Sequence, residues 1–289
     1  MKVLVTGSSG RIGMAIYGRL RRDGHAVVGL DVNPCSVSDV VGSITDEDKV
    51  RAALEGAQAV VHTAALHAPH VEHRLDDEFE AINVEGTATL VRLAREAGVD
   101  RFVFTSTTAL YGAGGMEPGR AAWVDEDTVP RPKTIYHRTK IAAEKLLEAE
   151  GAKGGLAITG LRMSRCFPEP AALMAAYRLH RGIDARDVAN AHVAALAWRG
   201  AGYRRYVISG KTPFAREDAA ELFRDAPAVL ARKAPRLVEA FSARGWKLPA
   251  SIDRVYDSSR AISELDWQPR YGFEEVLAQL DRESLEVLP

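Results

Sequence analysis

Residues 2–13 read KVLVTGSSGRIG, a short apolar run that leads directly into three glycines spaced three residues apart. The run predicts a buried β-strand, and the residues from Gly13 to Arg22 show the periodicity of an amphipathic helix. In such a unit Gly7 allows a tight turn, Gly10 lets the backbone approach a pyrophosphate, and Gly13 lets the helix pack close to the strand. Free amides and the positive end of the helix then face the anion. The segment therefore predicts a dinucleotide site in preference to an ordinary glycine-rich turn.

Short apolar runs alternate with longer amphipathic stretches through the first half of the chain, which is the pattern of βαβ units in a parallel sheet. Strands are predicted at residues 2–5, 26–31, 59–62, 101–105, 156–161 and 206–209. Helices are predicted at residues 13–22, 46–54, 79–96, 134–150 and 187–198. Together they predict an α/β fold, a doubly wound parallel sheet with a smaller capping region.

Prolines punctuate the chain after Arg162, and only short helical pieces are predicted there. We expect residues 1–165 to form the nucleotide-binding domain, to which a helix at 184–200 returns. Residues 166–183 and 205–289 are expected to form a smaller substrate-binding region.

Composition and charge narrow the classes of function. The 289 residues carry 38 Lys and Arg against 39 Asp and Glu, so the formal charge is -1 and no global field holds a polyanion. Apolar runs are too short for a signal-peptide core or a membrane span. Cys35 and Cys166 are too few for a disulfide framework or a Cys-rich zinc site. We expect a cytoplasmic protein with a small-molecule partner, without nucleic acid or membrane, and leave a homodimer open.

Asp31 ends the second predicted strand, 18 residues after Gly13, where an acidic side chain meets the ribose hydroxyls of an adenosine. Its carboxylate accepts two hydrogen bonds from the diol and repels a 2′-phosphate, which favours NAD over NADP. Arg11 in the glycine loop is still able to reach a phosphate. The structural alternative for Asp31 is that it caps a turn before Pro34.

Tyr136 and Lys140 lie four residues apart on a predicted helix and therefore share one face. A phenol, with a reference pKa of about 10, is a poor base at neutral pH, and a nearby cation favours the phenolate. We expect Lys140 to lower the pKa of Tyr136 and to hold a ribose hydroxyl. Residues 105–108 read TSTT at the end of the fourth predicted strand, the edge where ligands bind in open α/β sheets. One of these hydroxyls is expected to orient the reacting oxygen towards Tyr136.

In combination the sequence resembles the extended short-chain dehydrogenase/reductases, the NAD-dependent epimerase/dehydratase family. The matching segments, which run almost from end to end, are Thr6-Gly7-x-x-Gly10-x-x-Gly13, His62-Thr63-Ala64-Ala65, Asn83-Val84-x-Gly86-Thr87, Tyr111-Gly112, Tyr136-x-x-x-Lys140, Leu161-Arg162, Arg186-Asp187-Val188-Ala189 and Asp257-Ser258-Ser259-Arg260-Ala261. The resemblance implies a Rossmann-type fold and an enzyme that moves a hydride between NAD and a hydroxyl or carbonyl group.

The resemblance also implies which residues form the site. The implied cofactor-binding residues are Gly7, Ser9, Gly10, Arg11, Ile12, Gly13, Asp31, Ser43, Ile44, Ala64, Ala65, Tyr136 and Lys140. The implied catalytic set is Tyr136 as acid and base, Lys140, and Thr107 as the hydroxyl partner, with Ser106 as the fallback. Many members have Gly-Asp where this chain has Gly42-Ser43, so an adenine contact there falls to the Ser43 hydroxyl or to the backbone.

The substrate side departs from the family pattern. Only 24 residues separate Arg162 from Asp187, where nucleotide-sugar enzymes of the family usually have a long insertion. The resemblance therefore favours a small substrate such as a free sugar or sugar acid, and residues 163–170 are similar to the equivalent loop of uronate dehydrogenases. The candidate substrate residues are His67, Ser106, Arg165 and Arg178.

The same residues allow three other interpretations: a metal site, a sugar epimerase and a cofactor-sensing protein. His67, His70 and His73 have a spacing that suggests a metal, but Pro69 interrupts any helix that would align them, so we expect no metal site. A sugar epimerase without net redox is the second function on the same residues. A cofactor-sensing binding protein is the alternative from another class, against which the intact Tyr136, Lys140 and Thr107 argue.

Overall fold

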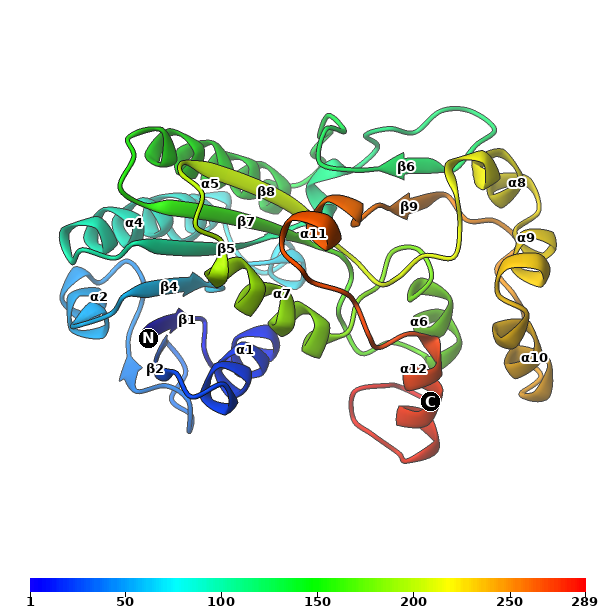
Figure 1. Ribbon diagram of the computed structural model, residues 1–289, viewed down its shortest axis with the longest axis horizontal. Helices are drawn as coiled ribbons and strands as arrows, with labels where there is room; N and C mark the ends of the chain where they lie inside the picture. Colours follow the sequence, from blue (N-terminus) through cyan, green and yellow to red (C-terminus); the bar gives the residue numbers. More distant parts are fainter. The chain divides into compact units, whose positions relative to one another are not determined.

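Seven strands form the main sheet of the computed structural model, which describes residues 1–289, in the order β3-β2-β1-β4-β5-β7-β8 (Figure 1). They are β1 (Lys2–Thr6), β2 (Ala26–Asp31), β3 (Val40–Val41), β4 (Ala59–His62), β5 (Arg101–Thr107), β7 (Ala157–Met163) and β8 (Tyr203–Ile208). β1 pairs in parallel with β2 and with β4, and β4 pairs in parallel with β5. The strand order reverses between β1 and β4, which is where open α/β sheets bind ligands. The predicted doubly wound fold is confirmed.

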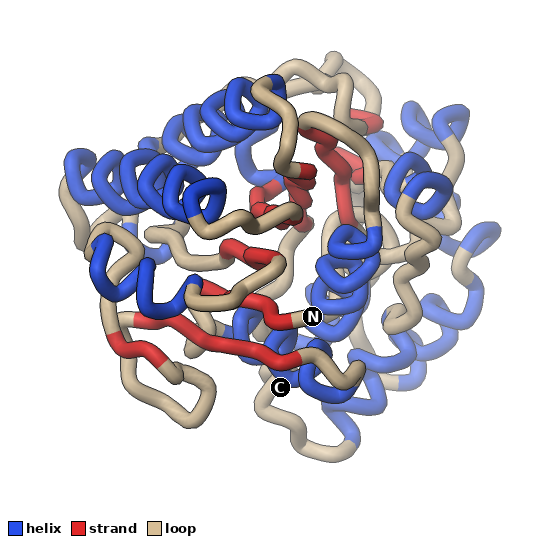
Figure 2. Tube along the Cα trace, turned by 60° about the vertical axis from the view of Figure 1, so that its left-hand side comes forward, coloured by secondary structure: helices blue, strands red, loops and turns tan.

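Helices cover both faces of this sheet (Figure 2). The helices that precede β8 in the chain are α1 (Arg11–Arg22), α2 (Glu47–Leu54), α3 (Asp76–Glu80), α4 (Gly86–Glu96), α5 (Ile135–Ala152), α6 (Ala171–Tyr177) and α7 (Ala185–Ala197). One apolar cluster joins α2, α4 and α5 to the strands, with Leu54, Leu90 and Leu147 among its members. On α1 the side chains of Ile16 and Leu20 are buried. Apolar residues at three- and four-residue intervals explain why α1, α2, α4 and α5 pack on the sheet. α6 packs in a separate apolar cluster instead.

The predicted strands 26–31 and 59–62 have the expected bounds, and most other predicted elements are shifted by about one to three residues. The strand predicted at 206–209, which we expected in the smaller substrate-binding region, is β8 of the main sheet. The strand predicted at 101–105 continues to Thr107, and the side chains of Ser106 and Thr107 are buried in it. The single helix predicted at 79–96 is broken by a π-helical turn, Ala81–Glu85, between α3 and α4. Three short strands were not predicted: β3, β6 (Ala122–Val124) and β9 (Arg254–Tyr256) are only two or three residues long, too short for an alternating pattern.

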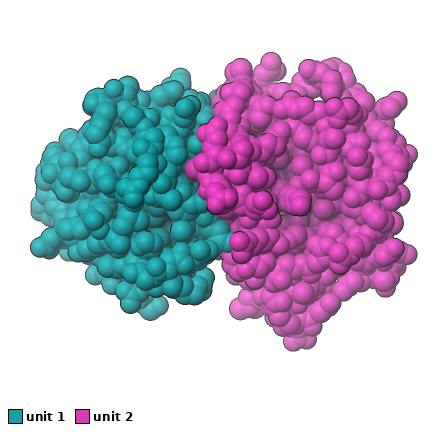
Figure 3. Space-filling model, in the orientation of Figure 1, with its two compact units in different colours: residues 1–110, 132–162, 188–206 teal, residues 111–131, 163–187, 207–289 magenta.

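The chain divides into two compact units (Figure 3). Unit 1 contains residues 1–110, 132–162 and 188–206, and unit 2 contains residues 111–131, 163–187 and 207–289. Residues 111–131, which we expected in the nucleotide-binding domain, therefore cluster with the second unit. They contain β6, which pairs in parallel with β9 near the end of the chain, so the pairing is too distant in sequence to read from local pattern.

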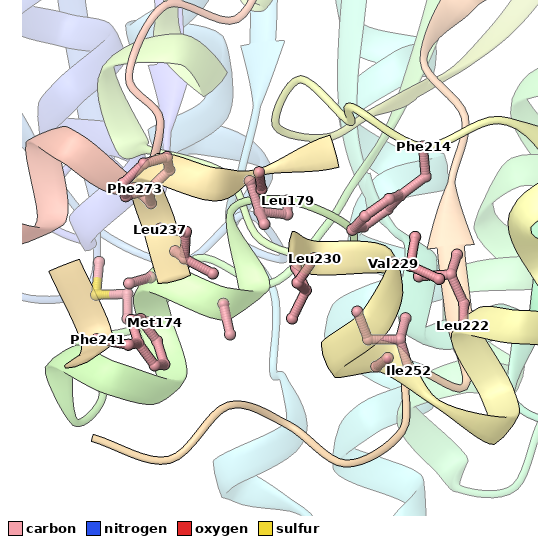
Figure 4. Packing of buried hydrophobic residues seen from close by; sticks show 14 of the residues in the cluster. Met174, Leu179, Phe214, Leu222, Val229, Leu230, Leu237, Phe241, Ile252 and Phe273 are labelled. Atoms are coloured by element: carbon pink, nitrogen blue, oxygen red, sulfur yellow. The ribbon is translucent and has the colours of Figure 1, made fainter. Parts of the chain in front are cut away.

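Unit 2 has a hydrophobic core of its own. Its remaining helices are α8 (Ala219–Arg224), α9 (Ala226–Lys233), α10 (Pro235–Ala243), α11 (Ser259–Glu264) and α12 (Phe273–Asp281). Leu179, Leu230 and Leu237 come from different segments and lie in one buried cluster (Figure 4). None of the helices in the chain has the length and apolar character that a bilayer span requires.

His62, the last residue of β4, is a buried polar group of unit 1. Its Nδ1 lies 2.7 Å from Thr6 Oγ1, and its Nε2 lies 3.0 Å from Thr87 Oγ1. Burial lowers the pKa of His62 to about 3, and repulsion by Lys140 acts in the same direction. The ring is therefore neutral at physiological pH and bridges β1 to α4.

We expect acid to destabilise the protein through His62. In the unfolded chain the ring binds a proton near its ordinary pKa of 6.5, whereas the folded ring stays neutral down to about pH 3. The contribution of His62 to the free energy of unfolding is thus fully present above pH 6.5 and is lost as the pH falls towards 3. Between pH 7.5 and pH 5 this loss amounts to about 2 kcal/mol. Urea unfolding at both values should show a smaller loss for His62→Gln than for the wild type, while exposed His73→Gln should behave like the wild type. Equal losses in all three proteins would contradict this.

Candidate active site

The glycine loop between β1 and α1 leaves no room for side chains. Gly7 has φ +68°, and a Cβ there would lie 2.6 Å from Ala64 N. A Cβ on Gly13 would lie 2.0 Å from Gly7 O, so α1 packs directly on the turn. Gly10 precedes α1, and no side chain caps the first amides of this 12-residue helix. The loop is thus a backbone cradle with free N–H donors at a helix N-terminus, as phosphate binding requires.

Asp31 lies beside this cradle at the end of β2. Its side chain is buried, and it accepts hydrogen bonds from Ser9 N at 3.0 Å and from Asn33 N at 2.9 Å. The carboxylate is therefore fixed against the glycine loop. Arg11 and Ile12 are half-buried in the first turn of α1.

The next two predicted cofactor residues have different surroundings. Ser43 Oγ lies 2.8 Å from Thr45 Oγ1 and also accepts from Thr45 N at 3.2 Å. Ile44 is buried, and its side chain fills the space beside Gly86, where a Cβ would lie 2.8 Å from Ile44 Cδ1. The Ser43 hydroxyl is thus half-buried beside Thr45, whereas the Ile44 side chain belongs to the core.

Tyr136 and Thr107 meet where α5 begins and β5 ends. Thr134 caps α5 by accepting a hydrogen bond from His137 N, which places Tyr136 in the first turn. The Thr107 side chain lies close enough to Tyr136 to lower the pKa of its hydroxyl. Thr107 Oγ1 already accepts from Ala109 N at 3.1 Å, so its own proton is available to Tyr136. The structure thus brings together the two hydroxyls that the sequence placed on separate elements.

Burial dominates the pKa of Tyr136. It raises the value to about 12, and the hydrogen bond from Thr107 only partly opposes it. The expected lowering by Lys140 is not observed, because the Lys140 ammonium donates to Thr105 O at 2.9 Å and lies over the Phe104 ring at 4.4 Å. Burial also lowers the pKa of Lys140 to about 7, against the attraction of Glu144. Tyr136 therefore holds its proton at neutral pH.

Glu144 and Arg162 form a buried group that the sequence analysis did not include in the site. Arg162 Nη2 lies 2.6 Å from Glu144 Oε2, and both side chains are about 5% exposed or less. Ser106 Oγ donates to Glu144 Oε1 at 2.5 Å. Ser106 is therefore engaged with this ion pair, and Thr107 is the hydroxyl that meets Tyr136. The spacing in the sequence could have indicated Glu144, because it follows Lys140 by four residues and lies on the same helix face.

Asn83 in the π-helical turn holds the loop after β4 next to α5. Its amide nitrogen donates to Leu66 O at 2.9 Å and to Thr139 Oγ1 at 3.1 Å, and its oxygen accepts from Leu66 N at 2.8 Å. His67 follows Leu66, and its ring stacks edge-on against that of His70 with 4.5 Å between centroids. No group of three or more His, Cys, Asp or Glu side chains is placed to hold a metal ion.

The candidate substrate residues Arg165 and Arg178 belong to unit 2, and each is paired with a carboxylate. Arg165 lies 2.6 Å from Glu169 with its side chain 44% exposed. Arg178 lies 3.1 Å from Asp184 and is only 2% exposed. Arg165 is accessible to a ligand, whereas the structure gives Arg178 a buried ion pair.

The sequence model of the NAD dependent epimerase/dehydratase family matches residues 3–170, more than half of the chain. The chain therefore belongs to this family, and NAD is its cofactor. The residues present fit NAD, since the glycine cradle has free amides for a pyrophosphate and Asp31 is held beside it. When bound, NAD supplies the acceptor or donor of hydride.

Curated relatives match over about half of the chain. A 3-beta-hydroxysteroid dehydrogenase from Mycolicibacterium neoaurum is 31% identical over 176 residues, which is 56% of this chain and 47% of that protein. A UDP-glucose 4-epimerase from Corynebacterium glutamicum is 30% identical over 170 residues, 56% of this chain and 50% of that protein. The aligned region thus spans about half the length of these relatives.

Solved structures share the fold over nearly the whole chain. A short-chain dehydrogenase/reductase superfamily protein from Agrobacterium tumefaciens with bound NAD has a TM-score of 0.72 at 23% identity, covering 96% of this chain and 95% of that one. The UDP-glucose 4-epimerase of Thermus thermophilus in complex with NAD has a TM-score of 0.70 at 24% identity, covering 97% of this chain and 98% of that one.

We expect Asp31 to make NAD bind at least about tenfold more tightly than NADP, a difference of about 1.4 kcal/mol. Fluorescence titration with both cofactors measures the ratio. Asp31→Asn keeps a hydrogen-bond acceptor and removes the charge that repels a 2′-phosphate. The ratio of NAD affinity to NADP affinity should therefore fall. Asp23→Asn, at the exposed C-terminal end of α1, should leave this ratio unchanged. Equal affinities in the wild type would refute this role.

Proposed function

We propose that this chain is an NAD-dependent oxidoreductase that acts on a hydroxyl or carbonyl group of a small carbohydrate-derived substrate, with Tyr136 as acid and base. The observation that supports this most is the meeting of the Tyr136 and Thr107 side chains where α5 begins and β5 ends, with Lys140 one helical turn away. A binding protein that only senses the cofactor has no use for this arrangement.

The proton chemistry follows from the two hydroxyls. A Tyr136 with a pKa of about 12 is a ready donor, so in the reductive direction it gives its proton to the carbonyl oxygen. In the oxidative direction it must receive the hydroxyl proton, and Thr107 then stabilises the phenolate by donating to it. Lys140, one helical turn further along α5, has a pKa of about 7 and can take up or release a proton near neutral pH.

The short substrate segment supports a small ligand. Residues 163–187 contain one short helix, α6, and belong to unit 2. Arg165 in this segment is the most accessible of the candidate anion contacts, which suits a sugar acid. We therefore favour a free sugar or a uronate over a nucleotide-linked sugar.

A thermal-shift screen in the presence of NAD tests the substrate class. A free sugar or uronate should raise the melting temperature more than its nucleotide-linked counterpart, because binding to the folded state stabilises it. A uridine-diphosphate sugar that protects the NAD complex more than any free sugar or uronate would overturn this preference.

A sugar epimerase is the second candidate function, and the curated UDP-glucose 4-epimerase of Corynebacterium glutamicum favours it. An epimerase turns over with bound NAD, whereas a dehydrogenase consumes NAD. Absorbance at the NADH band during turnover with each stabilising ligand separates the two. The cytoplasmic location and the homodimer stay predictions.

A further inference from the structure

Unit 2 contains a pocket of about 370 Å³ that no part of the proposed reaction uses. Five basic side chains and one carboxylate line it: Arg178, Lys211, Lys233, Arg236, Arg270 and Glu274. The whole chain has a formal charge of -1, so this density of positive charge is a local property of the pocket. Its size falls in the range of small-molecule sites.

Two of the basic groups have no carboxylate partner. Lys211 and Arg270 are exposed, and neither side chain forms an ion pair. Two others have only loose partners, since Lys233 lies 3.6 Å from Asp218 and Arg236 lies 3.5 Å from Glu274. The pocket therefore keeps an uncompensated positive charge that an anion would neutralise.

The backbone around the pocket adds to this field. α12 begins at the pocket wall, and no side chain caps its first amides. Helix N-termini carry partial positive charge and free N–H donors. Glu274 lies in the first turn of α12 and pairs with Arg236, so it is the one anion of the chain itself that competes for this space.

The wall beside Arg270 is rigidly built. Buried Asp187 accepts hydrogen bonds from Arg270 N at 2.9 Å and from Tyr271 N at 3.0 Å, and Trp267 Nε1 donates to Asp187 O at 3.0 Å. The guanidinium of Arg186 stacks on Tyr271 at 3.7 Å from the ring centroid. The segment that presents the Arg270 guanidinium is thus fixed before any ligand arrives.

Part of the pocket wall is apolar. Leu179 and Phe273 line the pocket and belong to the core of unit 2 (Figure 4), and Pro213 also contributes. A free inorganic anion would leave this surface unused. A ligand with one phosphate group and a compact organic body satisfies both halves of the pocket.

We propose that this pocket binds a small phosphate monoester, with Lys211 and Arg270 at the phosphate and the apolar wall against the organic body. The site lies within unit 2 and does not depend on Tyr136 or on the proposed reaction.

Calorimetric titration with phenyl phosphate tests the site, with phenol as the unphosphorylated probe and saturating NAD present to occupy the glycine loop. Phenyl phosphate should bind and phenol should not. The double variant Lys211→Met/Arg270→Met should bind at least about tenfold more weakly, since it removes two partly exposed charge contacts. Lys247→Met, an exposed lysine of unit 2 outside the pocket, should bind like the wild type.

Glu274→Gln gives a result that misfolding cannot imitate. It removes the competing carboxylate, so phenyl phosphate should bind about threefold more tightly. Failure of phenyl phosphate to bind the wild type, equal affinity of the wild type and the double variant, or weaker binding by Glu274→Gln would each overturn the proposal. Turnover is not measured, so the result is independent of the proposed function.

Discussion

Tyr136→Phe is expected to keep the affinity for NAD and to lose most of the turnover. The substitution deletes one hydroxyl in a buried position and leaves the ring in place, so the fold and the glycine cradle are undisturbed. Positioned acid–base groups contribute about 10²- to 10⁴-fold to a rate, and the loss should fall in that range. Cofactor titration and steady-state kinetics on the same preparation measure the two quantities.

Two controls locate this effect. Tyr17→Phe removes a hydroxyl that donates to Asp39 on the surface of α1, and it should leave turnover unchanged. Thr107→Val should lower turnover as well, because it removes the donor to Tyr136. Full activity of Tyr136→Phe would remove this residue from the mechanism.

Glu144→Leu is expected to destabilise the protein by about 3–5 kcal/mol, because it leaves the Arg162 guanidinium buried without its carboxylate. The double variant Glu144→Leu/Arg162→Met should recover much of that loss, since an apolar pair of similar size replaces the ion pair. Urea unfolding gives the free energy of unfolding for each variant.

Glu148 provides a matched comparison one helical turn further along α5. It pairs with Arg205 at 3.1 Å with its side chain 56% exposed. Glu148→Leu should change the free energy of unfolding by less than about 1 kcal/mol. If Glu144→Leu and Glu148→Leu lowered the free energy of unfolding by similar amounts, the buried Glu144–Arg162 pair would contribute little to stability.

The sequence predicted the sheet and the cradle well because both depend on local pattern. Strands 26–31 and 59–62 have the predicted bounds, since a short run of consecutive apolar residues before Asp31 and before His62 defines a buried strand. Gly7 and Gly13 were interpreted through the backbone conformation and close packing that only glycine allows, and the structure shows both.

Contacts between distant segments could not be predicted in this way. The pattern of hydroxyls at 105–108 did not say which would meet Tyr136, because that depends on the pleat of β5 against α5. Ser106 donates to Glu144, whereas Thr107, at the end of the strand, lies next to Tyr136. The pKa of Tyr136 was predicted in the wrong direction, since the spacing of Lys140 shows proximity and says nothing of burial.

The π-helical turn at Ala81–Glu85 sets a limit on how this family member can be shortened. A π turn accommodates one residue more than the α-helix around it, and each residue advances an α-helix by about 100°. Deleting one residue there would let α3 and α4 merge into a continuous α-helix. Asn83 would then rotate away from Leu66 and Thr139, and the loop that carries His67 would lose its attachment to α5. Sequence alignments that close a one-residue gap at this turn would therefore pair residues that occupy different faces of the helix.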